Sequence, residues 1–252
     1  ISFGTPVVFE SGTTYYNSAT YDSTNNKIVI AYRDAGNSDY GTAIVGSVSG
    51  TSISFGTPVV FESARSDYNS STYDSTNNKI VITYQDFGNS FYGTAIVGTV
   101  SSTSISFGTA VVFKNATSNR ISATYDSAND KVVITYQDDG NSGYGTASVG
   151  TVSGTSISFG TAEVFNTAST IYTSATYDSA NDKVVIAYAD NGNSGYGTAI
   201  VYKTTSTTNL TDENYIGVSN GAYSNAATAN VQITGSVNNA QSGLTAGQAY
   251  YA

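Results

Sequence analysis

The sequence contains no His, Cys, Met or Trp among its 252 residues. Without His and Cys it can form no Ser-His-Asp or Cys-His nucleophile, zinc finger, iron–sulfur cluster or disulfide framework. Asp and Asn are plentiful, so calcium held by oxygen ligands is compatible with the composition, but no motif calls for it and we predict no cofactor. The formal charge of −9 argues against nucleic acid and anionic membranes as partners.

Long apolar runs are also missing. No stretch of about 18 apolar residues is present, so we expect no membrane insertion. The chain opens at Ile1 without a Met or a basic-plus-apolar leader, part-way through a phrase that recurs, so we expect a fragment or a processed chain. Abundant Ser, Thr, Asn, Gly and Tyr with few charges are typical of extracellular or virion β proteins.

What the sequence does contain is a repeat. The phrase Ile-Ser-Phe-Gly-Thr begins at Ile1 and returns at Ile53, Ile105 and Ile157, 52 residues apart each time. Units one and two are identical at 41 of 52 positions, which predicts a repeat architecture. The units are residues 1–52, 53–104, 105–156 and 157–208, and a different segment, 209–252, follows them.

Each unit contains four strand-like segments and no helical pattern. In unit one they are residues 1–10, 17–22, 27–34 and 41–48, separated by turn-forming Ser, Thr, Asn and Gly. The segment 27–32 is apolar on both alternating faces, which indicates a strand buried on both sides. Radially stacked four-stranded sheets provide such burial. The sequence therefore predicts an all-β fold, a β-propeller with four blades if the chain is complete, and a small β extension at 209–252.

Strand order within a blade follows from small residues and proline. Residues 17–22 carry a small residue at the same place in every unit, which suits the crowded innermost strand. Pro6 and Pro58 lie in the Ile-Ser-Phe-Gly-Thr segment, which places that segment at the outer edge of a blade. Residues 1–10 would then close the ring by pairing with the last strand, Gly197–Lys203. A longer propeller cut short, or an unclosed array, is the alternative.

The units differ mainly on one side of the predicted disc. Seven of the 11 differences between units one and two fall at positions 12–15, 33, 35 and 39. These positions lie in the two kinds of connection that emerge on the same face of a propeller, which we call the variable face. Loops carried on a rigid scaffold commonly hold binding residues. Neutral drift in solvent-exposed loops is the alternative.

Side chains on the variable face are of the types that bind sugars and proteins. Tyr and Phe offer flat stacking surfaces, and the only three arginines of the sequence offer planar groups for a carboxylate, sulfate or phosphate. The candidate ligand-binding residues are Thr14, Tyr15, Tyr16, Arg33, Asp39, Arg65, Asp67, Tyr68, Phe87, Phe91, Asn119, Arg120, Asp139, Tyr172 and Asn191.

Two polar phrases are constant. In Asp34-x-Gly-Asn-Ser-x-Tyr40 we expect Asp34 to accept backbone N–H groups of Asn37 and Ser38, with Gly36 at positive φ. A ring of equivalent oxygen sites for a cation or sugar hydroxyls is the alternative. The phrase from Tyr21 to Lys27 lacks calcium-loop spacing and predicts a capped turn with a contact between Asp22 and Lys27.

Glycan hydrolysis is the enzymatic alternative. It needs two carboxylates of different pKa, and no pair of non-repeated acids has a recognisable context. The Asp-box phrase S-x-D-x-G-x-x-W of sialidase-like propellers is also absent. We therefore predict that the protein is not an enzyme and has no catalytic residues.

The C-terminal segment carries a resemblance. The phrases Glu213-Asn-Tyr-Ile-Gly-Val-Ser and Gln241-Ser-Gly-Leu-Thr-Ala-Gly-Gln resemble a module of tail-fibre-like and virion structural proteins of marine bacteriophages, and also of uncharacterised bacterial surface proteins. The 52-residue units resemble the repeats that precede that module. The resemblance implies a virion or cell-surface appendage and supplies no catalytic residues.

These observations favour a non-enzymatic adhesion module of a phage tail fibre or virion surface. Its expected partners are a cell-surface polysaccharide or glycoprotein, bound through the variable face, and other appendage subunits, bound through 209–252. The alternative is a purely structural spacer or polymer subunit. The expected location is the virion surface or the extracellular side of a cell.

Overall fold

The computed structural model describes residues 2–204, 218–219 and 231–232. The chain divides into two compact units, Ile1–Thr204 and Thr205–Ala252. In the second unit β16 (Val218–Ser219) pairs antiparallel with β17 (Val231–Gln232). The predicted contacts of 209–252 with other subunits, and most of the phrases that carry the phage resemblance, lie outside the described residues. The paragraphs below concern the first unit.

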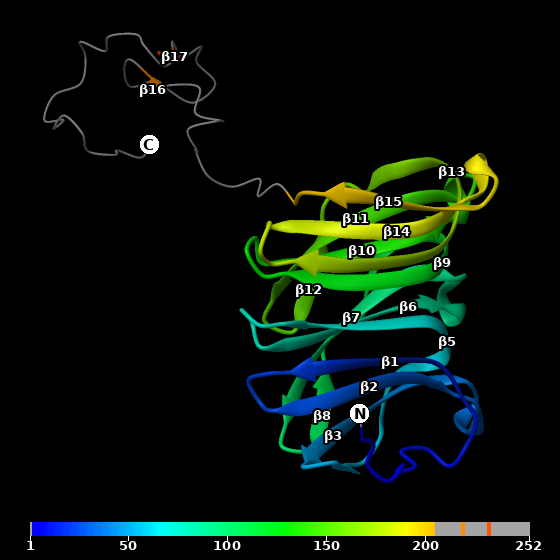
Figure 1. Cartoon of the computed structure of the whole chain (residues 1–252), viewed down its shortest axis with the longest axis vertical. Coiled ribbons are helices and arrows are strands. Elements are labelled where there is room, and N and C mark those ends of the chain that lie inside the picture. The colour runs from blue at the N-terminus through cyan, green and yellow to red at the C-terminus, as the bar shows by residue number, and fades with distance from the viewer. Residues whose placement is uncertain (1, 205–217, 220–230, 233–252) are drawn as a thin grey trace, which may run out of the picture. The chain divides into compact units, whose positions relative to one another are not determined.

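The first unit contains strands and four short 3-10 turns, which confirms the all-β prediction (Figure 1). Each 52-residue unit repeats the same series of strands, beginning near position 14. The strands are β1 (Thr14–Asp22), β2 (Lys27–Asp34), β3 (Tyr40–Ser49), β4 (Ser52–Phe55), β5 (Val59–Asp74), β6 (Lys79–Asp86), β7 (Tyr92–Ser101), β8 (Ser104–Phe107), β9 (Val111–Asp126), β10 (Lys131–Asp138), β11 (Tyr144–Ser153), β12 (Ser156–Phe159), β13 (Glu163–Asp178), β14 (Lys183–Asp190) and β15 (Tyr196–Tyr202). The 3-10 turns are η1 (Ala35–Asn37), η2 (Phe87–Asn89), η3 (Asp139–Asn141) and η4 (Asn191–Asn193).

Within a unit the strands pair in the predicted order. Blade 1 runs β1-β2-β3, and its outer edge is shared between β4, which pairs with the end of β3, and the first residues of β5, which pair with its beginning. Gly56, Thr57 and Pro58 interrupt this outer strand. Proline has no N–H to donate to a ladder, so an interrupted edge accommodates it.

The connection between blades differs from the expected loop. β5 runs 16 residues without a break: its start completes the edge of blade 1 and its end is the innermost strand of blade 2. A β-bulge between Asp67 and Ser70 separates the two halves, and Tyr68 at the bulge has φ of 54°. β9 and β13 bridge the later blades in the same way. The blades therefore form one continuous antiparallel sheet of 15 strands.

This sheet is open, which differs from the predicted closure of a ring. Residues 2–13 form no strand, and β15 pairs only with β14. The four blades stack from blade 1 at the blue end to blade 4 at the yellow end of Figure 1. The strand predicted at residues 1–10 is therefore wrong for unit one, although its equivalents in units two, three and four do form strands.

The N-terminal segment nevertheless packs as an outer strand would. Phe9 lies 5.3 Å from Tyr32 and 5.9 Å from Phe55, between ring centroids. One repeat later, Phe61 lies 5.2 Å from Tyr84 and 5.8 Å from Phe107. Residues near Phe9 thus occupy the place of the outer strand of a preceding blade. They form no strand because the structure contains no third strand of a preceding blade beside them to supply hydrogen-bond partners.

The core lies between the blades. We call the side of a blade that faces the next blade its upper side, and the other its lower side. Val29 and Ala31 on the upper side of blade 1 pack against Ile80 and Ile82 on the lower side of blade 2, and all four are fully buried. Two further clusters repeat this packing between blades 2 and 3 and between blades 3 and 4. The prediction that 27–32 is buried on both sides is confirmed for the equivalent part of β6, which lies inside the stack.

Polar contacts repeat at the same three junctions. Ser18 Oγ accepts the backbone N–H of Ser71 at 2.9 Å, and Ser70 and Ser122 make the equivalent bond to the next blade at 3.0 Å. The amide of Asn25 donates to Asn78 Oδ1, and those of Asn77 and Asn129 donate to the Asp one repeat onward. Each junction therefore fixes the register of neighbouring blades as well as burying apolar surface.

If the stack is open, the same Val→Ala substitution should lower the free energy of unfolding by different amounts at equivalent positions inside the stack and at its end. Val97 is 0% exposed and its equivalent in blade 4, Val201, is 61% exposed. Val97→Ala should lower the free energy of unfolding by about 2 kcal/mol, because it removes buried methyl groups and leaves a cavity. Val201→Ala should cost less than about 0.5 kcal/mol. Urea denaturation of the two variants measures both values, and an equal cost at the two positions would contradict the open stack.

Candidate functional site

The variable positions do gather at one edge of the stack. The bulged middle of β5 lies beside the turn after β2 and the turn after β6, because Tyr40 pairs with Arg65 and Ser66 pairs with Asp86. The same arrangement recurs at β9 and β13. These residues belong to bulged strands and tight 3-10 turns rather than to solvent loops. The backbone of the variable face is therefore paired with a neighbouring strand on each side at β5, β9 and β13.

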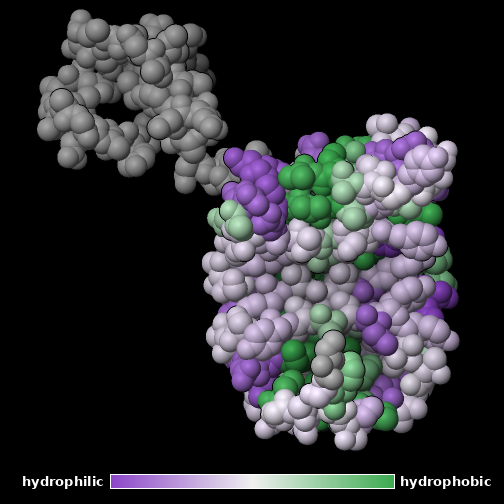
Figure 2. Space-filling view, viewed as in Figure 1, coloured by the Kyte–Doolittle hydropathy of each residue, from purple (hydrophilic) through white to green (hydrophobic). Residues whose placement is uncertain are grey.

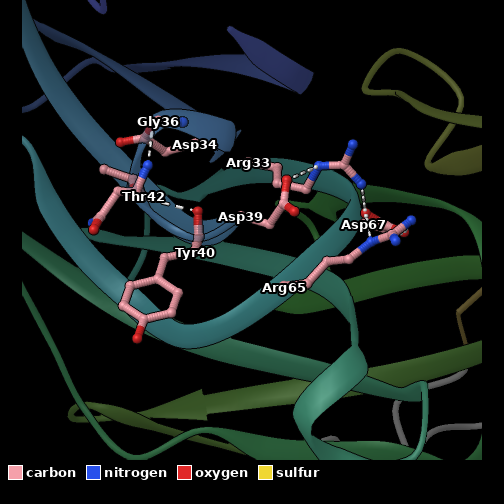
Figure 3. Close-up of polar contacts among 9 residues, drawn as sticks. Arg33, Asp34, Gly36, Asp39, Tyr40, Thr42, Arg65 and Asp67 are labelled. Atoms are coloured by element: carbon pink, nitrogen blue, oxygen red, sulfur yellow. Dashed lines mark hydrogen bonds and ion pairs between the residues drawn. The ribbon is translucent and has the colours of Figure 1, made fainter. Parts of the chain in front are cut away.

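An ionic cluster lies where blades 1 and 2 meet on this face (Figure 3). Arg33 Nη1 donates to Asp67 Oδ1, and Arg33 Nε lies 3.2 Å from Asp39 Oδ1. Arg65 also holds Asp67, with Nη2 2.7 Å from Oδ2 and Nε 3.0 Å from the same oxygen. Arg33 and Asp67 are buried, whereas the side chains of Arg65 and Asp39 are 43% and 42% exposed. The buried pair thus has a solvent-facing rim of one positive and one negative group.

Aromatic rings surround the arginines. The Arg33 guanidinium lies 4.1 Å from the centroid of Tyr15 and 5.3 Å from that of Tyr16, within cation–π distance. Tyr16 packs on Tyr68 of the next blade at 4.9 Å. Burial is the main cause that raises the pKa of Tyr16, followed by the Asp67 carboxylate. The phenol therefore stays neutral at physiological pH and can both donate and accept hydrogen bonds.

A second aromatic group lies one blade further. Phe87 and Phe91 flank the η2 turn with ring centroids 4.7 Å apart in an edge-to-face arrangement, and Arg65 lies 5.6 Å above Phe87. Both phenylalanines are exposed. At the last junction Arg120 lies 4.4 Å from the ring of Tyr172. Exposed rings beside arginines are thus found at three places along the face, near the turns of blades 1 and 2 and at the junction of blades 3 and 4.

The remaining candidates take part in polar contacts on the same face. Asn119 Nδ2 donates to Asp139 Oδ2 at 2.7 Å, Thr14 Oγ1 accepts from Asn17 at 3.2 Å, and Asn191 Nδ2 donates to Ser169 Oγ at 3.3 Å. Asp139 and Asn191 are exposed in their turns, whereas Thr14 and Asn119 are half-buried. All the predicted residues thus lie on the variable face, some at junctions and some within one blade, and Tyr15, Tyr16, Phe87, Phe91 and Tyr172 are those that present exposed rings.

Some variable residues differ in matched pairs across a junction, which the sequence comparison did not reveal. Arg33 contacts Asp67, and the residues one repeat later, Gln85 and Asn119, also contact each other, with Gln85 Nε2 donating to Asn119 Oδ1 at 2.7 Å. A charged pair in one junction is replaced by a neutral amide pair in the next. The signal available in the sequence was the 34-residue separation common to both pairs. Gln85 was missed as a site residue because it is buried between blades.

The constant Asp-x-Gly-Asn-Ser phrase builds the 3-10 turns. Asp34 Oδ1 accepts from the backbone N–H groups of Gly36 at 2.9 Å and Asn37 at 3.2 Å. The structural role and the donor Asn37 are therefore confirmed. The second predicted donor, Ser38, is wrong, because Gly36 donates instead, and so is the positive φ at Gly36: the left-handed residue is Ser38, with φ of 57°. Glycine is needed for space, since a Cβ at Gly88 would lie 2.7 Å from the Cβ of Ala64.

The constant phrase from Tyr21 to Lys27 forms the predicted capped turn. Asp22 accepts from the backbone N–H and the side-chain amide of Asn25, at 2.9 and 2.7 Å. The predicted contact between Asp22 and Lys27 is wrong, because Lys27 Nζ reaches across to Ser47 Oγ at 2.8 Å. The amide of Asn25 satisfies the carboxylate in place of the lysine.

A half-buried carboxylate, Glu62, lies near the site on the outer strand. Glu62 accepts a hydrogen bond from the Tyr84 hydroxyl at 3.1 Å. Burial, and then the Asp86 carboxylate, raises the pKa of Glu62. One repeat later the equivalent residue is Lys114, whose Nζ lies 2.6 Å from Asp138. Repulsion between Glu62 and Asp86 at the first junction thus corresponds to an ion pair at the second.

The described residues contain no group of three or more acidic side chains placed to hold a metal ion. Among the same residues no helix is long and apolar enough to cross a membrane. No protein-family model matches the sequence, and no curated protein matches it either. The functional argument therefore depends on the geometry of the variable face and on the resemblance in the sequence.

The matched pairs predict a specific rescue. Arg33→Gln should destabilise the protein by about 2 kcal/mol, because the buried Asp67 carboxylate loses its buried partner. Adding Asp67→Asn should recover at least about half of that loss, since the double variant copies the Gln85–Asn119 pair into the first junction. Urea denaturation of the single and double variants measures this coupling. Arg65→Gln, at a half-exposed side chain, is the control and should cost less than about 0.5 kcal/mol.

The raised pKa of Glu62 predicts a pH-dependent gain from Glu62→Gln. Protonated Glu62 favours the fold, so its stabilisation is complete below the pKa of the unfolded chain and is lost as pH rises through the higher pKa of the folded state. The variant should be more stable than the original protein at neutral pH, and the difference should disappear in acid. Thermal melting across pH measures this, with the exposed Glu163→Gln as control. A pH-independent difference would contradict the assignment.

Proposed function

We propose that the protein is a non-enzymatic adhesion module that binds a surface glycan through the variable face. The observation that carries the proposal is the row of exposed aromatic rings, each near an arginine, along one edge of a rigid stack. Sugar rings stack on flat aromatic faces, and arginine recognises carboxylate or sulfate groups on acidic sugars. An acidic surface polysaccharide therefore suits this face better than a neutral one.

The scaffold supports this proposal through its rigidity. The variable positions lie on bulged strands that belong to two blades at once, so the rings keep fixed separations along the stack. A binding surface that is ordered before binding loses less conformational entropy when the ligand binds. Successive blades present similar but unequal groups, which suits a polymer whose units also repeat with chemical variation.

The setting of the proposal comes from the sequence. The resemblance of the C-terminal segment to virion and surface proteins supports a role in a phage tail fibre or virion decoration, at the virion or cell surface. A purely structural spacer is the second candidate, and it is favoured by the junctions themselves, where apolar contacts and hydrogen bonds repeat three times. A closed β-propeller remains a proposal that requires further contacts at the open ends of the sheet.

Glycan binding can be tested on the exposed rings alone. The triple variant Tyr15→Ala, Phe87→Ala and Phe91→Ala should weaken binding to an array of acidic polysaccharides by at least about tenfold, as expected when stacking surfaces are lost. The melting temperature should change little, because these side chains are exposed. Phe3→Ala removes another exposed ring, outside the variable face, and is the control. Absence of binding by the original protein across such an array would favour the spacer.

A further inference from the structure

Among the residues that the structure describes, the two ends of the stack are unpartnered copies of a junction that the chain already makes three times. On the upper side of blade 4, Ala187 and Ala199 are exposed and Val201 is 61% exposed. The equivalent residues of blade 1, Ala31, Ala43 and Val45, are fully buried against blade 2. The upper side of blade 4 is therefore an interface surface without its partner.

The lower side of blade 1 is the matching surface, and it is also exposed. Ala19 and Tyr21 are exposed, and Ile28 and Ile30 are only half-buried. In blade 2 the residues equivalent to these isoleucines, Ile80 and Ile82, are fully buried against blade 1. Apolar areas are visible at both ends of the stack in Figure 2, on the surface that faces the viewer. The upper side of blade 4 is thus complementary to the lower side of another blade.

The polar groups of the junction are also in place at both ends. Ser174 on blade 4 is exposed and is equivalent to Ser18, Ser70 and Ser122, each of which accepts a backbone N–H of the next blade. On blade 1 the corresponding donor is the N–H of Ala19. Asn181 is equivalent to the asparagines that donate across the three junctions, and the matching acceptor position on blade 1 is Asn26.

A column of side chains along the inner strands shows the same continuity. Tyr16, Tyr68, Arg120 and Tyr172 occupy one repeat position, all with φ between 52° and 57°. Tyr16 packs on Tyr68, and Arg120 packs on Tyr172. Tyr172 ends the column with its ring 68% exposed, and Tyr16 begins it. Joining the two ends would place two tyrosines together, as at the first junction.

We propose that a second copy of this chain docks head to tail, with the lower side of its blade 1 on the upper side of blade 4. The two open sides lie at opposite ends of the stack, so a rigid copy cannot satisfy its own (Figure 1). Such a contact uses two different surfaces and leaves one of each free after every addition. It therefore extends into longer assemblies, or into a ring of blades if the rotation closes.

Blocking one end at a time tests the proposal on the full 252-residue chain. Ala187→Arg introduces a charge on the upper side of blade 4, and Ala19→Arg on the lower side of blade 1; both positions are exposed. Sedimentation velocity should show self-association of the original protein that grows with concentration, and each variant alone should remain a monomer. An equimolar mixture should form a dimer and stop, because each variant supplies the one end that the other lacks.

The mixture also controls for folding, since a misfolded variant could not supply its intact end. Ser153→Arg, at an exposed position away from both end surfaces, should associate like the original protein. The proposal is overturned if the original protein stays monomeric at all concentrations, as it would if its ends were already covered. It is also overturned if either variant alone still dimerises, because the contact would then join like surfaces.

Discussion

The structure depends on strands that are apolar on both sides and so need a neighbour above and below. In β6 every residue after Lys79 is buried, and this is possible only because blades 1 and 3 cover its two sides. A single 52-residue blade would expose apolar side chains to solvent on both of its sides. The strands therefore need to be stacked, and the stability of the stack resides in the junctions rather than in any one blade.

The same constraint determines how far the sequence could predict the fold. Residues 27–34 and 41–48 were predicted well, because two-sided burial and turn residues leave strong local patterns. Residues 1–10 were not, because their pattern is that of a strand while the described residues place no neighbouring strand beside them. A strand requires a neighbouring strand to supply hydrogen-bond partners, in addition to a suitable pattern of residues. Phe9 packs on Tyr32 although its backbone has no such partners, so side-chain packing can persist without the backbone hydrogen bonds.

The candidate site was located by comparing the units, but its chemistry was only partly foreseen. The sequence comparison predicts that positions 15 and 33 contact a ligand. In the structure Asp67, which is position 15 of unit two, forms an ion pair with Arg33 between blades. Repeat comparison cannot separate positions that vary because they bind a ligand from positions that vary together across a junction. Exposure separates them: Phe87 and Phe91 face solvent, whereas Arg33 and Gln85 lie between blades.

Two uses of variation therefore coexist on one face. Paired residues at the junctions make neighbouring blades chemically distinct, so that Arg33 suits Asp67 better than it would suit Asn119. Exposed rings at the rim also contact arginines, but they keep surface in solvent on which a ligand could stack. In the bulge of β5 the junction residue Asp67 is next to Tyr68, whose ring packs on Tyr16, so a change at this junction should also move the neighbouring rim. Under the proposed function, blade order and binding specificity would thus be coupled through the backbone of β5.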